Sequence, residues 1–252
     1  MLCENGHLDE AMEALYHDVH MPLSVRVYLS LLKACCKNKA PHHAKHVCTH
    51  INHHHVQLSG FLGDFLVMTL AKCGAVSDAS RISETLTVRT VFSWTAIIAS
   101  YAENGCGIEA LEAYECMLRD GVEPNSYTFV SLFRACGDIS DLVHGKRFHK
   151  EARRRNLLGN IFVANTLISM YGKCCYVHEA TNIFNHAKDR DIISWNAFIA
   201  CLIHHECCDE ALRKFRQIQI TIVIPDKVTF LCILDACAKV TSLIEGQEVH
   251  MI

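Results

Sequence analysis

Histidines and cysteines are the residues of this chain whose number and spacing first suggest chemistry, because both side chains bind zinc. The 252 residues include 17 histidines and 15 cysteines. His42, His46 and His50 fall at i, i+4 and i+8 on one face of a helix, and an i, i+4 pair can chelate zinc. No second shell of ligands accompanies them, and short histidine-rich tracts bind metal weakly as a matter of composition. We therefore predict no metal site here and interpret the cluster as surface variation. Its members are His42, His43, His46, His50, His53, His54 and His55.

Motifs for enzymatic catalysis are incomplete in this sequence. Zinc deaminases need His-x-Glu followed by Pro-Cys-x-x-Cys, which supplies three zinc ligands and a proton-transferring glutamate. His149 to Glu151 and His204 to Glu206 match the first half, but no two cysteines are three residues apart and no proline precedes a cysteine. A phosphate-binding glycine loop and a Gly-x-Ser-x-Gly nucleophile elbow are also missing. The sequence predicts no catalytic residue and no cofactor.

The composition excludes several classes of protein. Half of the residues are apolar, a fifth are charged, and Gly and Pro together number 16, which excludes disordered and collagen-like chains. No apolar run reaches the roughly 18–20 residues needed to cross a bilayer, so we expect no membrane partner. The net charge of −3 gives no global attraction to nucleic acid. The N-terminus has no visible secretory or transit peptide, and together with the odd cysteine count this predicts reduced thiols.

Landmarks recur at a spacing of 101 residues along the whole chain. Ala-Cys pairs at 34–35, 135–136 and 236–237 keep this spacing, as do the Lys-Cys, Ser-Trp, Glu-Ala-Leu and Pro landmarks between them. Such self-similarity indicates an array of structural repeats.

Each 101-residue unit divides into three helical hairpins. In segment 91–125, a first apolar stripe at 94, 97, 98 and 101 has the spacing of a buried helix face. Asn104-Gly105 interrupts it, and a second stripe consists of Ile108, Leu111, Tyr114 and Leu118. The alternating isoleucines between 218 and 224 look locally like a strand, but a lone strand has no partner in a helical array, so we expect an atypical linker there. The segments predicted in this way are 1–24, 25–59, 60–90, 91–125, 126–160, 161–191, 192–226 and 227–252.

We therefore predict an all-α fold, a superhelical solenoid of stacked helix-turn-helix hairpins whose first helices line a concave surface. Most apolar residues, including most cysteines, are expected in the core between hairpins, because free cysteine behaves as a small buried hydrophobe.

The landmarks resemble those of plant pentatricopeptide repeat proteins over essentially the whole chain. Matching segments are Phe92 to Ile98, Ile193 to Asn196, Leu32 to Cys35, Gly145 to His149 and Tyr171 to Cys174. The match is best to the subclass that alternates standard, long-type and short-type repeats. On this resemblance 91–125 and 192–226 are standard, 25–59 and 126–160 are long-type, 60–90 and 161–191 are short-type, 227–252 is a partial long-type repeat and 1–24 is partial.

The resemblance implies binding of single-stranded organellar RNA, with one base recognised by two side chains of each repeat. These are the fifth residue, on the first turn of the first helix, and the last residue. An Asn amide offers a donor and an acceptor together, and a Thr hydroxyl can act as either. In the family Thr with Asn favours adenine, and Asn with Asp favours uracil. The predicted RNA-binding pairs are Thr95 with Asn125, Asn165 with Asp191, and Asn196 with Asp226.

In the other repeats, the residues at these two positions do not indicate a base preference. Asp64 with Thr90 is a pair that we cannot decode, and the long-type repeats have Leu29, Val130 and Leu231 at the fifth position, without a hydrogen-bonding group. With RNA running 5′ to 3′ along the array, as in the family, segments 91–226 predict adenine, an unread base, uracil and uracil. A basic run could contact phosphate, but we favour a solvated helix face for it. The run is Lys146, Arg147, Lys150, Arg153, Arg154 and Arg155, with Glu151 among them.

The resemblance further implies a plastid or mitochondrial location and a role in C-to-U editing or processing of transcripts, with an editing deaminase or other editing factors acting in trans. The alternatives are a scaffold for protein–protein interaction and a non-functional truncated copy. Both Met1 and Ile252 fall inside a predicted repeat, so we expect a fragment, an incomplete gene model or a degenerate copy.

Overall fold

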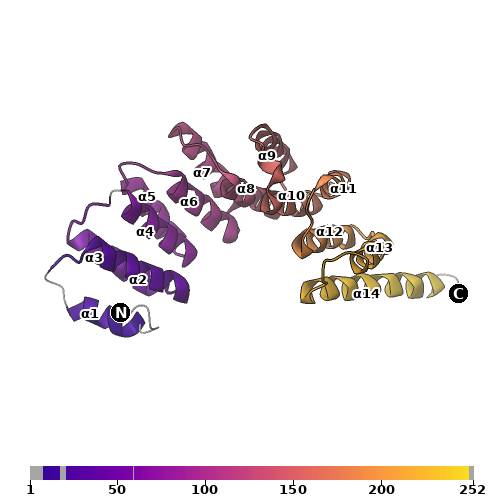
Figure 1. The fold of residues 1–252 in the computed structure, drawn as a ribbon, viewed down its shortest axis with the longest axis horizontal. Coiled ribbons are helices and arrows are strands. Elements are labelled where there is room, and N and C mark those ends of the chain that lie inside the picture. The colour runs from indigo at the N-terminus through magenta and orange to yellow at the C-terminus, as the bar shows by residue number, and fades with distance from the viewer. Residues whose placement is uncertain (1–7, 18–20, 59, 250–252) are drawn as a thin grey trace. The chain divides into compact units, whose positions relative to one another are not determined.

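The computed structural model describes residues 8–17, 21–58 and 60–249, and the elements that it assigns there are all helices (Figure 1). The chain divides into two compact units, Met1–Ser131 and Leu132–Ile252, so that helix α8 contributes to both. Parts of the predicted repeats 1–24 and 227–252 lie outside the described residues. No described helix combines the length and the apolar character that crossing a membrane requires.

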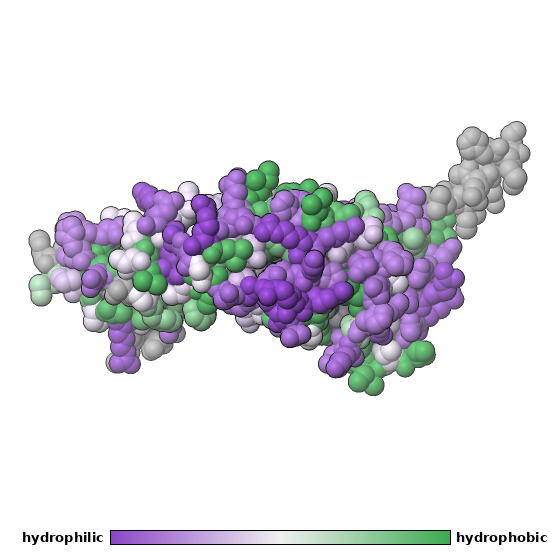
Figure 2. All heavy atoms as spheres, turned by 90° about the horizontal axis from the view of Figure 1, so that it is seen from above, coloured by the Kyte–Doolittle hydropathy of each residue, from purple (hydrophilic) through white to green (hydrophobic). Residues whose placement is uncertain are grey.

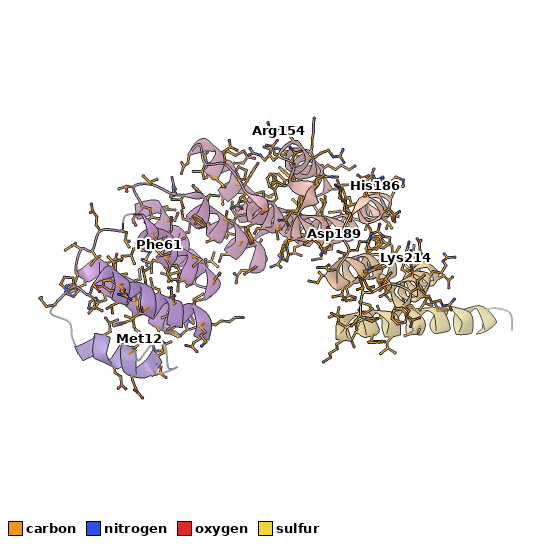
Figure 3. The ribbon with its side chains drawn as sticks, in the orientation of Figure 1. Met12, Phe61, Arg154, His186, Asp189 and Lys214 are labelled. Atoms are coloured by element: carbon orange, nitrogen blue, oxygen red, sulfur yellow. The ribbon has the colours of Figure 1, made fainter. Side chains whose placement is uncertain are left out.

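Unit 1 is a stack of helical hairpins. Its first helices α2, α4 and α6 pack side by side, and each also packs against the second helix that follows it. Met12 of α1 is buried, and α1 contacts α2 (Figure 3). The helices of this unit are α1 (Leu8–His17), α2 (Val25–Asn38), α3 (Pro41–His53), α4 (Phe61–Lys72), α5 (Val76–Thr85), α6 (Val91–Glu103), α7 (Gly107–Arg119) and the beginning of α8 (Ser126–Asp138).

Unit 2 repeats this arrangement. The first helices α10, α12 and α14 pack in sequence, and α11 and α13 pack behind α10 and α12. The unit contains the end of α8, α9 (Leu142–Arg154), the 3₁₀ turn η2 (Leu157–Gly159), α10 (Ile161–Lys173), α11 (Val177–His186), α12 (Ile192–His204), α13 (Cys208–Gln219) and α14 (Lys227–Val249).

Side-chain caps determine where several first helices begin. Thr90 accepts a hydrogen bond from the Phe92 N–H at the start of α6, Asn160 caps α10, and Asp191 accepts from the Ser194 N–H at the start of α12. Each of these side chains satisfies a backbone donor that the first helical turn leaves without a partner. The helices therefore start immediately after a polar residue.

Left-handed residues make the turns inside the hairpins. Gly74 and Gly105 have φ of 80° and 76° in unit 1. The residues 101 positions later are Cys175 and Glu206, with φ of 58° and 59°. A side chain with a β-carbon is strained in this region, whereas glycine is not. The two units thus form the same turns, but the backbone strain at these positions is greater in unit 2.

The predicted apolar stripe of α6 is buried except for Tyr101, which is half-buried, and that of α7 is only partly correct. Trp94, Ile97 and Ile98 are nearly inaccessible to solvent. On α7, Ile108 is 64% exposed and Leu118 36% exposed, although the sequence placed both on the buried face. Tyr114 of the predicted stripe is buried, and Ala110, Ala113 and Met117 are buried beside it. The buried face of α7 is therefore rotated from the predicted one, and Ile108 and Leu118 lie outside it.

Cysteines contribute less to the core than predicted. The 14 described cysteines are free thiols, and five of them are buried, namely Cys35, Cys48, Cys136, Cys201 and Cys208. The expectation that most cysteines fill the core is therefore wrong. Burial raises the pKa of Cys136 and Cys201 to about 12, which keeps these two thiols protonated.

The linker between α13 and α14 is not a strand. Ile218 is fully buried in α13, whereas Ile220, Ile222 and Ile224 are at least 82% exposed. Residue 222 stands 101 positions after Gly121, which ends α7 with φ of 71°. A β-branched side chain disfavours that conformation, and Ile222 does not adopt a positive φ. The surface in Figure 2 accordingly carries hydrophobic side chains among the hydrophilic ones.

Helix α14 differs from its sister α8 in a similar way. The chain after α8 turns at Ser140, which has φ of 54°, but α14 runs without a break from Lys227 to Val249. The helix thus continues where the sister hairpin bends.

Candidate nucleic-acid interface

Two of the predicted residue pairs form direct side-chain hydrogen bonds. Asn165 Nδ2 donates to Asp191 Oδ1 at 3.2 Å, and Asn196 Nδ2 donates to Asp226 Oδ1 at 3.0 Å. The two partners are 26 and 30 residues apart in the sequence. The hairpin fold brings the fifth and last residues of these segments together.

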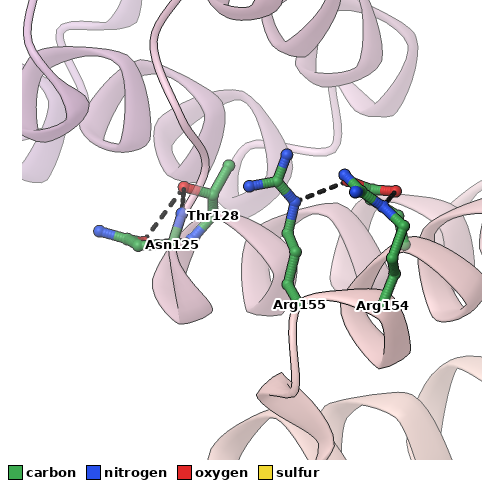
Figure 4. Close-up of polar contacts among 5 residues, drawn as sticks. Asn125, Thr128, Arg154 and Arg155 are labelled. Atoms are coloured by element: carbon green, nitrogen blue, oxygen red, sulfur yellow. Dashed lines mark hydrogen bonds and ion pairs between the residues drawn. The ribbon is translucent and has the colours of Figure 1, made fainter.

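The third predicted pair is joined through another residue. The hydroxyls of Thr95 and Thr128 are 2.8 Å apart, and Thr128 Oγ1 donates to Asn125 Oδ1 at 3.2 Å (Figure 4). Thr229, 101 residues after Thr128, donates to Asn196 Oδ1 at 2.7 Å. The sequence did not single out these two threonines, because they belong to long-type segments whose fifth residue is apolar. Their common spacing of 101 residues is the signal that identifies them.

Asp64 and Thr90 also form a pair, with the roles of donor and acceptor reversed. Thr90 Oγ1 donates to Asp64 Oδ2 at 2.8 Å, so the carboxylate stands on the first helix and the donor at the end of the segment. The fifth residues of the long-type segments have no such contact: Leu29 and Val130 are half-buried, and Leu231 is 56% exposed.

The carboxylates of Asp191 and Asp226 fix the orientation of their asparagine partners. Burial raises the pKa of Asp191, but hydrogen bonds from Ser194 and Asn165 outweigh this and lower the pKa overall. The Thr229 N–H and then the Asn196 amide lower the pKa of Asp226. An ionised carboxylate only accepts hydrogen bonds, so the NH₂ group of each asparagine must face it. The amide oxygen of each asparagine consequently points away from the aspartate.

The two amide oxygens have different surroundings. Asn196 Oδ1 accepts the hydrogen bond from Thr229, whereas Asn165 Oδ1 has no partner among the described residues. Both asparagines are more than 90% buried. Asn165 therefore offers an amide oxygen that no protein group uses.

A groove in unit 2 connects the two Asn–Asp sites. It has a volume of about 510 Å³ and is lined by Asn165, Asn196 and Asp226, together with Arg134 and Lys173. Polar groups with both donors and acceptors thus share one hollow with two basic side chains. Lys173 also forms an ion pair with Asp138 at 2.6 Å.

Exposed apolar residues occupy the second position of six consecutive segments. Phe61, labelled in Figure 3, is 66% exposed, and Ile193 and Val228 line the groove of unit 2. Sequence analysis assigned most apolar residues to the core and missed this series. A large apolar residue recurring directly after the first residue of each segment is the pattern that could have revealed it. The series is Phe61, Phe92, Tyr127, Phe162, Ile193 and Val228.

The basic run is largely engaged in local contacts. Arg154 and Arg155 both bind Glu151, at 2.7 and 2.6 Å, and Arg154 points into solvent (Figures 3 and 4). These arginines lower the pKa of Glu151 to about 2, chiefly through the hydrogen bond from Arg154. Lys146 lies 4.1 Å from the ring centre of Tyr176. No residue of the run lines the groove of unit 2.

The interpretation of the histidine cluster as surface variation is wrong for His50, which is buried on α3. His50 Nδ1 is 2.9 Å from the Tyr28 hydroxyl, and the His50 and His54 rings are 4.5 Å apart. Among the described residues, no group of three His, Cys, Asp or Glu side chains is arranged to hold a metal ion.

Profiles of repeat families match the middle and the C-terminal part of the sequence. The profile described as PPR repeat family matches residues 89–138, and the profile described as PPR repeat matches residues 162–192 and 193–219.

Relatives from Arabidopsis thaliana match nearly the whole chain. The chloroplastic pentatricopeptide repeat-containing protein At4g18520 is 32% identical over 88% of this chain and 36% of its own length. The mitochondrial protein At3g13770, a putative pentatricopeptide repeat-containing protein, is 30% identical over 99% of this chain and 40% of its own length. The chain therefore spans less than half of these relatives.

A solved structure shares the fold. The crystal structure of the pentatricopeptide repeat protein PPR10 in complex with an 18-nt psaJ RNA element matches 98% of this chain and 37% of that chain, with a TM-score of 0.75 and 15% identity. This likeness confirms the predicted fold class, an all-α superhelical solenoid of stacked helical hairpins.

Proposed function

Since the chain belongs to the pentatricopeptide repeat family, we propose that it binds single-stranded RNA and discriminates bases through the paired fifth and last residues of its repeats. The observation that carries this proposal is the groove of unit 2, which is lined by the two paired asparagines Asn165 and Asn196 and by Asp226. The relatives are chloroplastic or mitochondrial proteins by name, which supports a plastid or mitochondrial location.

The oriented asparagines match uracil. One hydrogen of each NH₂ group bonds the aspartate, so each amide retains a second N–H donor. The Asn165 oxygen is an unused acceptor, and the Asn196 oxygen keeps a second lone pair beside the bond from Thr229. Uracil has an N–H donor beside a carbonyl acceptor on its Watson–Crick edge, and such edges are exposed in single-stranded RNA. The predicted uracil sites are therefore Asn165 with Asp191 and Asn196 with Asp226. Thr95 with Asn125, joined by Thr128, remains our proposal for adenine.

The exposed apolar residues provide the second component of binding. Unstacked bases gain about 1–3 kcal/mol each by stacking on aromatic side chains, whatever their sequence. Phe92, Tyr127 and Phe162 are 58–69% exposed at the start of successive first helices. We assign stacking to these residues and selectivity to the polar pairs.

Electrostatic attraction is modest in this chain. Arg134 and Lys173 line the groove and can contact phosphates, but the net charge of the chain is −3. Few phosphate contacts imply a shallow dependence of affinity on salt. Binding should consequently depend more on base identity than binding by a strongly basic protein does.

Within RNA maturation, the chain would mark a site for C-to-U editing or processing, and any deaminase would act in trans. The matched repeat fold is a binding scaffold, and we propose no catalytic role for this chain. The assignment to the subclass with standard, long-type and short-type repeats is part of the same proposal.

Equilibrium binding to single-stranded RNA tests the proposal directly. We expect saturable binding at moderate salt to RNAs with uracil at the two predicted positions. Asn196→Ala and Asp226→Ala should each remove about 1–3 kcal/mol of discrimination at the second uracil. Asn185→Ala, on exposed α11 away from the groove, is the matched control. Unchanged base preference in both variants would refute the assignment, and absence of saturable binding would favour a protein-interaction scaffold.

A further inference from the structure

The carboxylate of Asp64 has an oxygen that no other group uses. Asp64 is only 8% exposed, and its Oδ1 has no hydrogen-bond partner among the residues that the structure describes. Leaving a buried polar group without a partner costs about 1–3 kcal/mol, more for a charged one. Such groups in folded proteins call for an explanation, and a ligand that donates hydrogen bonds is one.

The partner of Asp64 has no proton left to donate. The Thr90 hydroxyl donates to Asp64 Oδ2 at 2.8 Å, and its oxygen accepts the Phe92 N–H at 3.1 Å as the cap of α6. A hydroxyl has a single proton, so Asp64 consumes the donor capacity of Thr90. The pair therefore presents acceptors alone, unlike the Asn–Asp pairs, which keep one donor and one acceptor.

We propose that Asp64 and Thr90 form a guanine-selective site, an inference that rests on the proposed RNA-binding function. Guanine has two neighbouring N–H donors on its Watson–Crick edge, at N1 and N2. Adenine and cytosine each place a ring-nitrogen lone pair beside their single amino group, and uracil flanks its single N–H with carbonyls. A carboxylate has two acceptor oxygens and binds a pair of parallel donors bidentately. Only guanine offers that pair.

The surroundings of Asp64 suit a base. Helices α4 and α6 pack side by side, and each has an exposed phenylalanine in its first turn, Phe61 at 66% and Phe92 at 69% exposure. These rings provide apolar faces on which a base can stack at the starts of the two helices that hold the pair. Asp64 lies in the first turn of α4, beside the start of the helix. The terminal torsion of Asp is broad, so the carboxylate can turn toward an incoming base.

Four RNAs that differ in one base test the inference on the full 252-residue chain. Following the order of repeats, they share the sequence 5′-NACUU-3′ within a constant flank, with N facing segment 60–90. Fluorescence anisotropy should show about tenfold tighter binding when N is guanine than when it is any other base. Asp64→Asn should abolish this preference and leave the uracil preferences unchanged. Asp78→Asn, which removes a half-buried carboxylate of α5 that pairs with Lys45, is the control and should keep the guanine preference.

The outcomes separate this inference from the function on which it rests. Absence of saturable binding to all four RNAs overturns the proposed function and the guanine site together. Selectivity for the two uracils with equal binding of all four bases at N overturns the guanine site alone. The comparison of the four RNAs uses the unaltered chain, so it remains decisive even where Asp64→Asn disturbs folding.

Discussion

Segments 60–90 and 161–191 stand 101 residues apart in the sequence. In both, the fifth and last residues form a hydrogen bond, but the donor and the acceptor are exchanged. In the first, the carboxylate of Asp64 is on the first helix and accepts from Thr90. In the second, Asn165 on the first helix donates to the carboxylate of Asp191. The fold keeps the fifth and last residues in contact in both segments. The geometry thus belongs to the repeat, whereas the direction of the hydrogen bond belongs to the individual residues.

This reversal changes what each pair offers to a base. The Asn165 pair keeps a donor and an acceptor, while the Asp64 pair keeps acceptors only. Two sites of equal shape are therefore expected to select different bases, and the difference resides in the polarity of one hydrogen bond.

The largest effect is expected from converting one segment into the other. Asp64→Asn combined with Thr90→Asp reproduces the pair of segment 161–191, since aspartate also caps helices. We expect the preference at this position to change from guanine to uracil, with a swing of about 1–3 kcal/mol for each base. Binding to RNAs with each of the four bases at this position measures it. Retention of the guanine preference would mean that the pair does not determine selectivity.

A smaller effect concerns the turns of the two units. Cys175→Gly and Glu206→Gly restore the residues that unit 1 has at Gly74 and Gly105, and should each stabilise the chain by about 0.5–1 kcal/mol. Relief of left-handed strain exceeds the entropy that glycine adds to the unfolded chain. Thermal unfolding should shift upward by about 1–4 °C. Glu210→Gly, inside α13, should instead destabilise, and equal effects of all three changes would contradict the argument.

The smallest effect is a dependence of stability on pH that arises from His149 in unit 2. Burial, and then the charge of Arg153, lower the pKa of His149, which bonds the Tyr171 hydroxyl; its counterpart in unit 1 is Cys48. Because the unfolded chain binds the proton more readily, stability is lost as pH falls from about 6.5 through the lowered folded value. Thermal midpoints measured between pH 8 and 5 should fall less for His149→Gln. An identical slope in both proteins would exclude His149 as its source.

The sequence predicted the repeats well because their signals are local and periodic. Gly105 and the buried positions Trp94, Ile97 and Ile98 mark a turn and a helix face with side chains whose effect does not depend on distant residues. The fifth and last residues were chosen because of the family resemblance, and the register then gave their numbers.

The details of the site depended on tertiary neighbours and could not be predicted. The orientation of Asn165 is decided by Asp191, 26 residues away, and the difference between Asn165 and Asn196 by the Thr229 hydroxyl. Ile108 was wrongly predicted to be buried, because hydropathy does not reveal that Ala110 and Ala113 lie on the buried face of α7 instead. Exposed Phe61 and Phe92 look like core residues when only their type is known.

The last residue of a repeat has two structural roles, and this limits which residues can replace it during evolution. Thr90 and Asp191 each bond the fifth residue of their own segment and also cap the helix that opens the next one. Only Ser, Thr, Asp and Asn cap well through a side-chain hydrogen bond, and replacement by Ala costs about 0.5–2 kcal/mol. Helix capping alone therefore restricts this position to four residue types, independently of RNA binding. Specificity for a new RNA sequence must therefore arise mainly through mutation of the fifth residue, which does not also cap a helix.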